Sequence, residues 1–479
     1  MKTVRKLLIP IALVTTMPAI FASCSLNKFR KSTNIFSKNY VDTHKVKIKT
    51  PNKKHNLIYI TVESLESTVL DEKDGGKLKN GSNIMPELTK LAKENVTFAQ
   101  GDNLAGPYVF DWSDDTIRGF VSQSSGIPLK DPWKVEEKGK IFFPKVKTTS
   151  DILFENGYNN YFIAGHDVDY ANHSGYLKSH HYHWYDFKGG SIDDDDLDIH
   201  YSTGAGKYYL DNKQLDDSHW GKEEQIDGTW EIPKEYLGRW GYKDPLLFKN
   251  AQRILNNLSK ESKPFNLQIL TVDTHRPHGD SITGKSLNGI DLAKKFPHHT
   301  KNMGDKNSVE SIKDIDETID MEESFRYISF LINEFIDWCK QQDWYENTTI
   351  VISGDHLSMD EGTKQYYYGT YNKEGYFTKF NKNGKKQENR KVYSTIINPS
   401  KELKYDPKRL KNRKFSTLDL FPTTIAALGF EIEGNKLGLG TNLFSGEKSL
   451  PEKYGYKYIN EEFNKRSHFY NNLCFGQDD

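Results

Sequence analysis

Short apolar runs rich in β-branched residues alternate with helical patterns along most of this chain, and this alternation constrains the fold more than any other feature. The runs lie at 56–62 (Asn-Leu-Ile-Tyr-Ile-Thr-Val), 160–164, 265–272, 348–353 and 392–397. The expected helices cover 85–95, 149–156, 245–258, 322–340 and 418–428, the last beginning around Pro422. Strands separated by helices form a largely parallel sheet that is covered on both faces. The pattern therefore predicts an α/β protein with a mostly parallel central sheet and helices on both faces.

The composition excludes several classes of protein. Hydrophobic residues make up 36% of the 479 residues and aromatic residues 13%, which is enough to build a sizeable core. Lys+Arg and Asp+Glu both number 66, so the chain lacks the basic excess of a nucleic-acid binder, and no nucleic-acid partner is expected. Three cysteines exclude a disulfide scaffold and a cysteine-based zinc module.

The N-terminus has the pattern of an export signal. Lys2 and Arg5 precede an apolar stretch, 7–22, that is shorter than the ~20 residues of a membrane-spanning helix. Residues 1–23 are therefore predicted to be a lipoprotein-type signal peptide, with Cys24 as the lipidated cysteine of a sequence that resembles a bacterial lipobox. An uncleaved anchor helix is the alternative. Both interpretations predict an extracytoplasmic protein that is anchored to the cell membrane.

The rest of the chain is expected to form one domain with two flanking segments. Residues 24–55 are polar and lack a hydrophobic period, so they are predicted to be a linker. Residues 56–446 are predicted to form the catalytic domain, and 447–479 a C-terminal extension that packs on the domain or trails behind it. Cys339 continues an apolar helical stripe and is predicted to be a buried thiol. The sequence leaves undecided whether it forms a disulfide with Cys474.

Three of the apolar runs are followed directly by carboxylate or imidazole side chains. Glu63 follows the first run, Asp273 and His275 the run at 265–272, and Asp355 and His356 the run at 348–353. In parallel sheets, ligands bind beyond the carboxyl ends of the strands. Each residue alone is weak evidence, because acidic residues at strand ends often only form turns. Together, oxygen and nitrogen donors of these types suit Mn²⁺, Mg²⁺ or Zn²⁺, so the coincidence predicts a metal site.

A nucleophile is suggested by Thr116, which follows an acidic loop and precedes an apolar segment of helical pattern. A threonine at a helix N-terminus is more often a cap than a nucleophile. If its oxygen contacts a metal, however, the pKa of the hydroxyl falls and the oxygen becomes reactive. The same helix N-terminus would help to hold a phosphate group.

Four segments carry a resemblance to a known family. They are, in chain order, 56–68 (NLIYITVESLEST), 116–129 (TIRGFVSQSSGIPL), 270–277 (LTVDTHRP) and 351–359 (VISGDHLSM). These segments resemble the phosphoglycerol transferases, which include the enzyme that modifies periplasmic glucans (phosphoglycerol transferase I) and, more remotely, lipoteichoic acid synthase. That family belongs to the sulfatase-like branch of the alkaline phosphatase superfamily. The resemblance covers about residues 56–446 and implies an alkaline-phosphatase-like fold.

The resemblance implies specific roles for the same residues. Glu63, Thr116, Asp355 and His356 match the ligands of one divalent metal, usually Mn²⁺, with Mg²⁺ or Zn²⁺ as alternatives. Thr116 also matches the nucleophile that carries phosphoglycerol as a covalent intermediate, and His275 matches the histidine that contacts the substrate phosphate. These roles agree with the chemistry of phosphoryl transfer, in which catalysis is mainly positioning and charge stabilisation.

The implied reaction moves phosphoglycerol from phosphatidylglycerol to a hydroxyl of a glycan or glycolipid. The lipid anchor would hold the enzyme at the membrane surface where this donor lies. Two departures from the family leave the donor head group and the acceptor open. His173 stands where relatives have a basic residue that binds the phosphoglycerol head, and 111–115 (Asp-Trp-Ser-Asp-Asp) replaces a glycine-containing approach to the nucleophile.

Several alternative functions remain open. A phosphodiesterase of the same fold would use water as the acceptor, and a phosphoethanolamine transferase would use another head group. A sulfatase is disfavoured, because it needs Cys or Ser within C/S-x-P-x-R, whereas Thr116 is followed by Ile117 and Arg118. A non-catalytic surface lipoprotein that serves as a binding module is the least favoured, since all four ligand-type residues and His275 are retained.

Overall fold

The computed structural model of the protein describes residues 32–76, 83–100, 104, 106–130, 142–187, 209–210, 213–214, 225–226, 229–230, 234–238, 240–275, 282–297, 317–358, 369–371, 377–380 and 390–476. The expected signal peptide and Cys24 lie outside these residues. Among the described residues, no helix has both the length and the apolar character that crossing a membrane requires.

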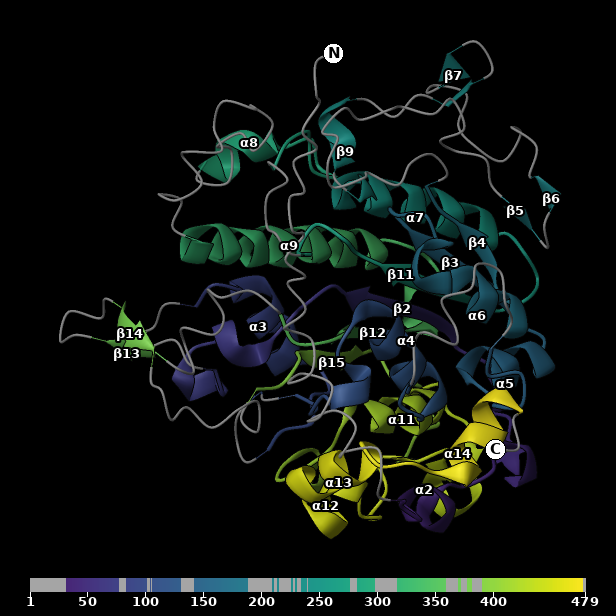
Figure 1. Ribbon diagram of the computed structural model, residues 1–479. Helices are drawn as coiled ribbons and strands as arrows, with labels where there is room; N and C mark the ends of the chain where they lie inside the picture. Colours follow the sequence, from purple (N-terminus) through teal and green to yellow (C-terminus); the bar gives the residue numbers. More distant parts are fainter. Residues whose placement is uncertain are drawn as a thin grey trace, which may run out of the picture.

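An eight-stranded sheet forms the centre of the molecule, in the order β15-β12-β2-β11-β3-β4-β5-β6 (Figure 1). The parallel strands are β12 (Thr348–Gly354), β2 (Asn56–Val62), β11 (Phe265–Leu270), β3 (Asn159–Ala164) and β4 (His183–Tyr185). The antiparallel strands at the edges are β15 (Ser394–Ile397), β5 (Tyr209–Leu210) and β6 (Lys213–Gln214). The predicted mostly parallel sheet is confirmed, and an antiparallel strand at the edge of such a sheet is common.

Helices cover both faces of this sheet, as the sequence predicts. Every residue of β2 is buried, and successive side chains point to opposite faces. Ile58 and Ile60 pack in one cluster with helices α3 (Pro86–Glu94), α7 (Asp244–Leu258) and α9 (Glu317–Cys339). On the other face lie α4 (Thr116–Ser125), α5 (Thr149–Glu155), α6 (His173–Ser179) and α11 (Leu420–Ala427) (Figure 1). A continuous apolar strand is what burial on both faces requires.

Helix α11 begins earlier than the sequence pattern predicts. It starts at Leu420 and follows a 3₁₀ turn, Thr417–Asp419, whose capping box pairs Ser416 with Asp419. Pro422 therefore lies in the first turn of the helix, where its missing N–H costs no hydrogen bond. The expected start around Pro422 is therefore wrong by about half a turn. The capping box of Ser416 and Asp419, rather than the proline, sets where the helical segment begins.

The described part of the expected linker, 24–55, is packed on the domain. Helix α2 (Ile35–Asn39) buries Phe36 against aromatic rings of the C-terminal segment. Strand β1 (Ile48–Lys49) pairs antiparallel with β16 (Glu431–Ile432). The linker prediction is corrected for this part, since a single buried turn and a two-residue strand are too short to show a hydrophobic period.

The C-terminal segment forms three short helices beneath the sheet, next to α2 (Figure 1). They are α12 (Leu450–Tyr454), α13 (Tyr456–Phe463) and α14 (His468–Phe475). Their apolar residues belong to the same cluster as Phe36 and helix α4. Residues 450–475 are therefore a structural part of the domain.

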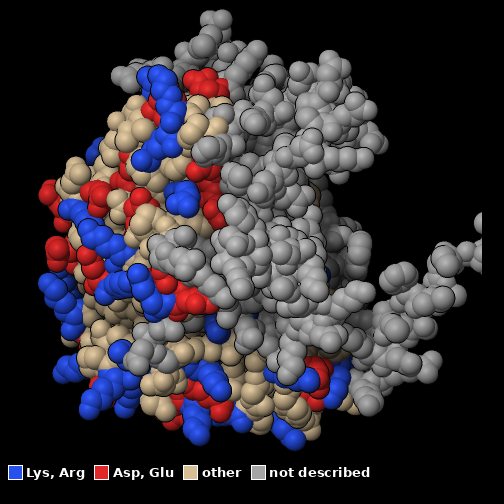
Figure 2. Space-filling view, turned by 90° about the vertical axis from the view of Figure 1, so that its left-hand side faces the viewer, with Lys and Arg blue, Asp and Glu red and all other residues tan. Residues whose placement is uncertain are grey.

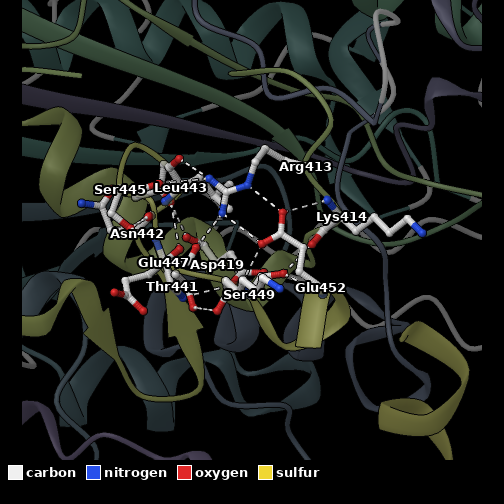
Figure 3. Close-up of polar contacts among 12 residues, drawn as sticks. Arg413, Lys414, Asp419, Thr441, Asn442, Leu443, Ser445, Glu447, Ser449 and Glu452 are labelled. Carbon is white, nitrogen blue, oxygen red and sulfur yellow. Dashed lines mark hydrogen bonds and ion pairs between the residues drawn. The ribbon is translucent and has the colours of Figure 1, made fainter. Parts of the chain in front are cut away.

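One arginine ties the start of α12 to the domain (Figure 3). The Arg413 guanidinium donates to Glu452 Oε1 at 2.7 Å, to the Leu443 carbonyl at 2.6 Å and to the Glu447 carbonyl at 2.9 Å. Glu452 also completes the capping box of α12 with Ser449. Because Arg413 is buried and its donors are satisfied by fixed groups, this network sets the position of α12.

The two described cysteines are free and buried, so the disulfide that the sequence left open does not form. Cys339 lies in the cluster under α7 and α9, whereas Cys474 lies in the cluster around α4. Burial raises the pKa of both thiols, which makes them unreactive at neutral pH.

Basic and acidic side chains are intermixed on the described part of the face in Figure 2. Exposed ion pairs of the described residues include Lys49 with Glu431 at 2.9 Å and Lys340 with Asp337 at 2.9 Å. Such pairs contribute at most about 1 kcal/mol each, so they affect solubility more than stability.

Candidate active site

Neighbouring parallel strands bring the predicted site residues to one edge of the sheet. In the pairing of β2 with β12, Val62 lies opposite Gly354, so Glu63 and Asp355 follow side by side. The ligand atoms of Glu63, Asp355 and His356 lie within 4.8 Å of one another, and all three side chains are buried. The strand ends thus converge as the sequence predicts.

A strained turn after β2 positions the two carboxylates. Ser64 has φ +54°, a left-handed conformation that costs a non-glycine residue roughly 1–2 kcal/mol. In this conformation, its amide donates to Asp355 Oδ1 at 2.8 Å and its hydroxyl donates to Glu63 Oε1 at 2.7 Å. The His356 amide also donates to Asp355 Oδ1, at 2.6 Å. Asp355 Oδ2 is buried and has no hydrogen-bond partner among the described residues.

The imidazole of His356 is oriented by the backbone. Its Nδ1 lies 2.9 Å from the Leu357 carbonyl, and a hydrogen bond there requires a proton on Nδ1. The other nitrogen, Nε2, faces the carboxylates, at 3.2 Å from Glu63 Oε1 and 3.6 Å from Asp355 Oδ2. A second hydrogen bond of this kind is what fixes a metal-binding histidine in its tautomer and orientation.

Thr116 joins this cluster from the other side. It is the first residue of α4, and its hydroxyl donates to Glu63 Oε2 at 2.9 Å. The helix is capped by Asp115, which accepts from the Arg118 amide at 2.9 Å. Because Asp115 serves as the cap, the Thr116 hydroxyl is free of that role and points at the carboxylates.

Backbone packing fixes α4 against the strand end. A Cβ atom on Gly119 would lie 2.5 Å from the Asp355 carbonyl oxygen, so only glycine permits this approach. Gln123, one turn further along, donates through Nε2 to the Gly354 carbonyl at 2.9 Å. The position of Thr116 relative to Asp355 is thus set by two rigid elements.

The charges in the cluster depend on one another. Burial would raise the pKa of Glu63, but the neighbouring His356 and His275 hold this pKa below its usual value. Burial and the charge of Glu63 raise the pKa of Asp355 well above its usual value. Burial would lower the pKa of His356, but Asp355 and Glu63 raise it well above its usual value. Two buried carboxylates at this spacing need a compensating positive charge.

A divalent cation fits the residues present. Glu63, Thr116 and Asp355 offer oxygen donors and His356 offers a nitrogen, a set that suits Mn²⁺, Mg²⁺ or Zn²⁺. The unpartnered Asp355 Oδ2 is a buried polar atom that such an ion would satisfy. These four residues are the ones that would hold the ion.

His275 lies next to the cluster but outside the group of possible ligands among the described residues. It follows β11, and its ring lies 4.4 Å from the ring of Trp240, centroid to centroid. The turn is held by Asp244, which accepts from the amides of Val272 at 2.9 Å and Asp273 at 3.1 Å. The neighbouring Thr274 hydroxyl donates to the Glu63 carbonyl at 2.5 Å, which places the turn that carries His275 beside the cluster.

His173 is buried at the start of α6, beside a second histidine that the sequence analysis missed. His166 follows β3, and the two rings lie 5.2 Å apart. His173 Nδ1 lies 2.9 Å from the Tyr170 carbonyl, while Nε2 of each histidine is buried and finds no hydrogen-bond partner in the part of the chain that the structure describes. Burial and His173 lower the pKa of His166 to about 3, so its imidazole is neutral at physiological pH. His166 could have been found, because it follows a predicted strand by two residues.

A family model described as Sulfatase matches residues 55–430. This chain belongs to the sulfatase family. Its described fold agrees with that of a lipoteichoic acid synthase from Listeria monocytogenes, with a TM-score of 0.51 and 16% identity over 86% of this chain and 82% of the synthase. The expected alkaline-phosphatase-like fold is confirmed.

Curated relatives of this sulfatase-family chain are named phosphoglycerol transferase I. The chain is 28% identical over 409 residues to the protein from Salmonella choleraesuis, covering 84% of this chain and 41% of the relative. It is 29% identical over 321 residues to the protein from Salmonella paratyphi B, covering 66% and 32%. The chain thus spans about a third to two fifths of the length of these relatives.

Proposed function

We propose that this protein is a metal-dependent phosphoglycerol transferase, which moves phosphoglycerol from phosphatidylglycerol to a hydroxyl of a glycan or glycolipid. The observation that carries the proposal is the Thr116 hydroxyl, which lies 2.9 Å from Glu63 in a buried cluster of two carboxylates and an imidazole. The names of the curated relatives support the choice of phosphoglycerol as the transferred group.

The first displacement forms a bond between Thr116 Oγ and phosphorus while the bond from phosphorus to the diacylglycerol oxygen breaks. A divalent ion, when bound, lowers the pKa of the hydroxyl and offsets the charge of the phosphate. The Thr116 hydroxyl donates to Glu63 Oε2, which orients Oγ for the attack; its proton passes to solvent in this step and is regained from solvent when Oγ leaves in the second. His275 donates a proton to the leaving diacylglycerol oxygen, since it follows β11 next to the cluster.

The second displacement reverses these roles. The hydroxyl of the acceptor attacks phosphorus, the bond to Thr116 Oγ breaks, and His275 takes the proton of the attacking hydroxyl. Two in-line displacements give net retention at phosphorus. With water in place of the acceptor, the same steps describe a phosphodiesterase.

His173 and His166 are proposed to hold the glycerol head of the donor. Their Nε2 atoms are buried and unpartnered, and a buried polar atom without a partner costs roughly 1–3 kcal/mol. Glycerol hydroxyls can donate to a neutral imidazole nitrogen, which suits the lowered pKa values of both histidines. Two histidines here would replace the basic residue that the family resemblance implies.

One assay separates the transferase from its alternatives. The full-length protein is incubated with labelled phosphatidylglycerol and Mn²⁺, with and without a neutral glucan, and the products are identified by mass spectrometry. A transferase attaches phosphoglycerol to the glucan and releases diacylglycerol. Free glycerophosphate alone indicates a phosphodiesterase, and turnover of phosphatidylethanolamine in its place indicates a phosphoethanolamine transferase.

We expect His275→Ala to lower turnover by roughly 10²–10⁴-fold, because the leaving oxygen loses its proton donor. The metal content should stay unchanged, since His275 is not one of the four proposed ligands. Turnover of labelled phosphatidylglycerol and elemental analysis measure the two properties on the same sample. A variant with full turnover would show that His275 is only structural.

Attachment to the outer face of the membrane is proposed through Cys24. Tethering keeps the enzyme at a high effective concentration over a lipid donor. We expect Cys24→Ala to move the protein from the membrane fraction to the soluble fraction, as followed by immunoblotting. Membrane retention of this variant would support an uncleaved anchor helix instead.

A further inference from the structure

An open groove with a tyrosine lining lies on the C-terminal helices, outside the cluster described above. Its volume is about 510 Å³, within the ~300–1,000 Å³ range of small-molecule sites. The side chains that line it are Tyr108, Tyr454, Tyr456, Lys457, Tyr458 and Glu461. Tyr454 is 44% exposed and Tyr458 48%, an unusual exposure for two large aromatic side chains on neighbouring helices.

The tyrosines of this groove are held in place before any ligand binds. Tyr456 stacks on Tyr108 at 4.8 Å and on Phe110 at 5.4 Å, and its hydroxyl donates to the Val109 carbonyl at 2.9 Å. The Tyr454 hydroxyl donates to Asn39 Oδ1 at 3.2 Å. The Arg413 network fixes the helix that carries Tyr454 (Figure 3). Rigid side chains lose little entropy when a ligand binds.

Buried packing links the wall of the groove to the candidate active site. Val109, the neighbour of Tyr108, packs against Leu357, which directly follows His356. The segment that begins at Tyr108 also leads within eight residues to Thr116. The segment that carries Thr116 therefore also supplies one wall of the groove.

The lining of the groove favours a neutral sugar chain. Tyrosine rings offer flat apolar faces that stack on the C–H face of a pyranose ring, while their hydroxyl groups bond to sugar hydroxyls. Lys457 and Glu461 add one charge of each sign, so the lining does not select an anion. An acyl chain would be matched by aliphatic side chains, and none lines the described groove.

We propose that this tyrosine groove binds the sugar chain of the acceptor. The identification of the bound sugar as an acceptor rests on the proposed transferase function, whereas sugar binding itself does not.

Binding of neutral gluco-oligosaccharides to the full-length protein tests the groove directly, by calorimetry and by saturation-transfer NMR. We expect Tyr454→Ala combined with Tyr458→Ala to weaken binding at least about tenfold, because two stacking faces are lost. Tyr458→Phe keeps the ring and should bind within about twofold of the unmodified protein. Phe154→Ala removes an equally exposed ring from α5, outside the groove, and should bind normally. Thermal melting checks that the variants are folded.

Two results would overturn the proposal: no binding of any oligosaccharide by the unmodified protein, or equal binding by the double variant. Transfer assays separate this proposal from the proposed function. If the double variant loses sugar binding and neither the variants nor the unmodified protein transfer phosphoglycerol, the groove proposal is supported and the transferase proposal is contradicted. Transfer to an oligosaccharide with a KM that the double variant leaves unchanged supports the transferase and overturns the groove.

Discussion

Thr116→Ala is expected to lower turnover of phosphatidylglycerol by about 10⁴–10⁶-fold, the usual effect of removing a nucleophile. Rapid acid quenching of the unmodified protein, followed by peptide mass spectrometry, should show the mass of phosphoglycerol on the peptide that contains Thr116. The adduct should be absent from the alanine variant. The reason is geometric, because Thr116 is the one described hydroxyl that donates to Glu63 Oε2 in the cluster.

Two control variants sharpen this experiment. Thr116→Ser keeps the hydroxyl and should still form the adduct, although the loss of the methyl group loosens its position. Ser113→Ala removes a buried hydroxyl three residues earlier that has no hydrogen-bond partner, and it should leave the adduct unchanged. An adduct on another residue, or turnover that persists in Thr116→Ala, would refute the proposed nucleophile.

Asp355→Asn is expected to abolish the uptake of a divalent metal and, with it, turnover. Asparagine keeps the shape and the Oδ1 acceptor for the amides of Ser64 and His356, but it removes the charge that the ion needs. Elemental analysis after dialysis measures the bound metal. A ligand at 100 times its Kd stabilises a protein by about 2.7 kcal/mol, so Mn²⁺ should raise the melting temperature of the unmodified protein but not that of Asp355→Asn.

Asp337→Asn is the matched control for this change. Asp337 is an exposed carboxylate on α9, and its replacement should leave both metal content and the Mn²⁺-dependent melting shift intact. Repeating the metal-content and melting measurements with Mg²⁺ and Zn²⁺ ranks the three ions by how well they bind. Full metal content in Asp355→Asn would contradict the proposed ligand set.

The sequence alone was sufficient to predict that the two carboxylates at the strand ends lie close together. Glu63 and Asp355 each follow an apolar run directly, and parallel strands must end at one edge, so their convergence needs no tertiary information. Thr116 is different, because its position depends on how α4 docks on the sheet. That docking rests on the close approach of Gly119 to the Asp355 backbone, and a glycine in a helical pattern does not reveal its neighbour. The residues around Thr116 suggested a nucleophile there, and the family resemblance implied that it belongs to the same site as Glu63 and Asp355.

The features that the sequence analysis missed share a physical cause. Phe36 in α2 is buried, but one buried aromatic in a five-residue helix gives no periodic signal. His166 was within reach, because the strand before it was predicted and the rule used for Glu63 applies to it as well.

The distance along the chain between the two halves of the site has a consequence for how the protein would acquire the proposed metal. Ser64 and Asp355 are joined by a 2.8 Å hydrogen bond although 291 positions separate them. Glu63 and Asp355 therefore meet only after β12 has paired with β2, and contacts between such distant segments form late and slowly. Because an unfolded chain has no preformed site, metal capture completes folding instead of starting it. The ion is then drawn from the compartment in which the chain finishes folding, so the ion supply of that compartment, and not that of the ribosome's surroundings, decides which metal the finished protein carries.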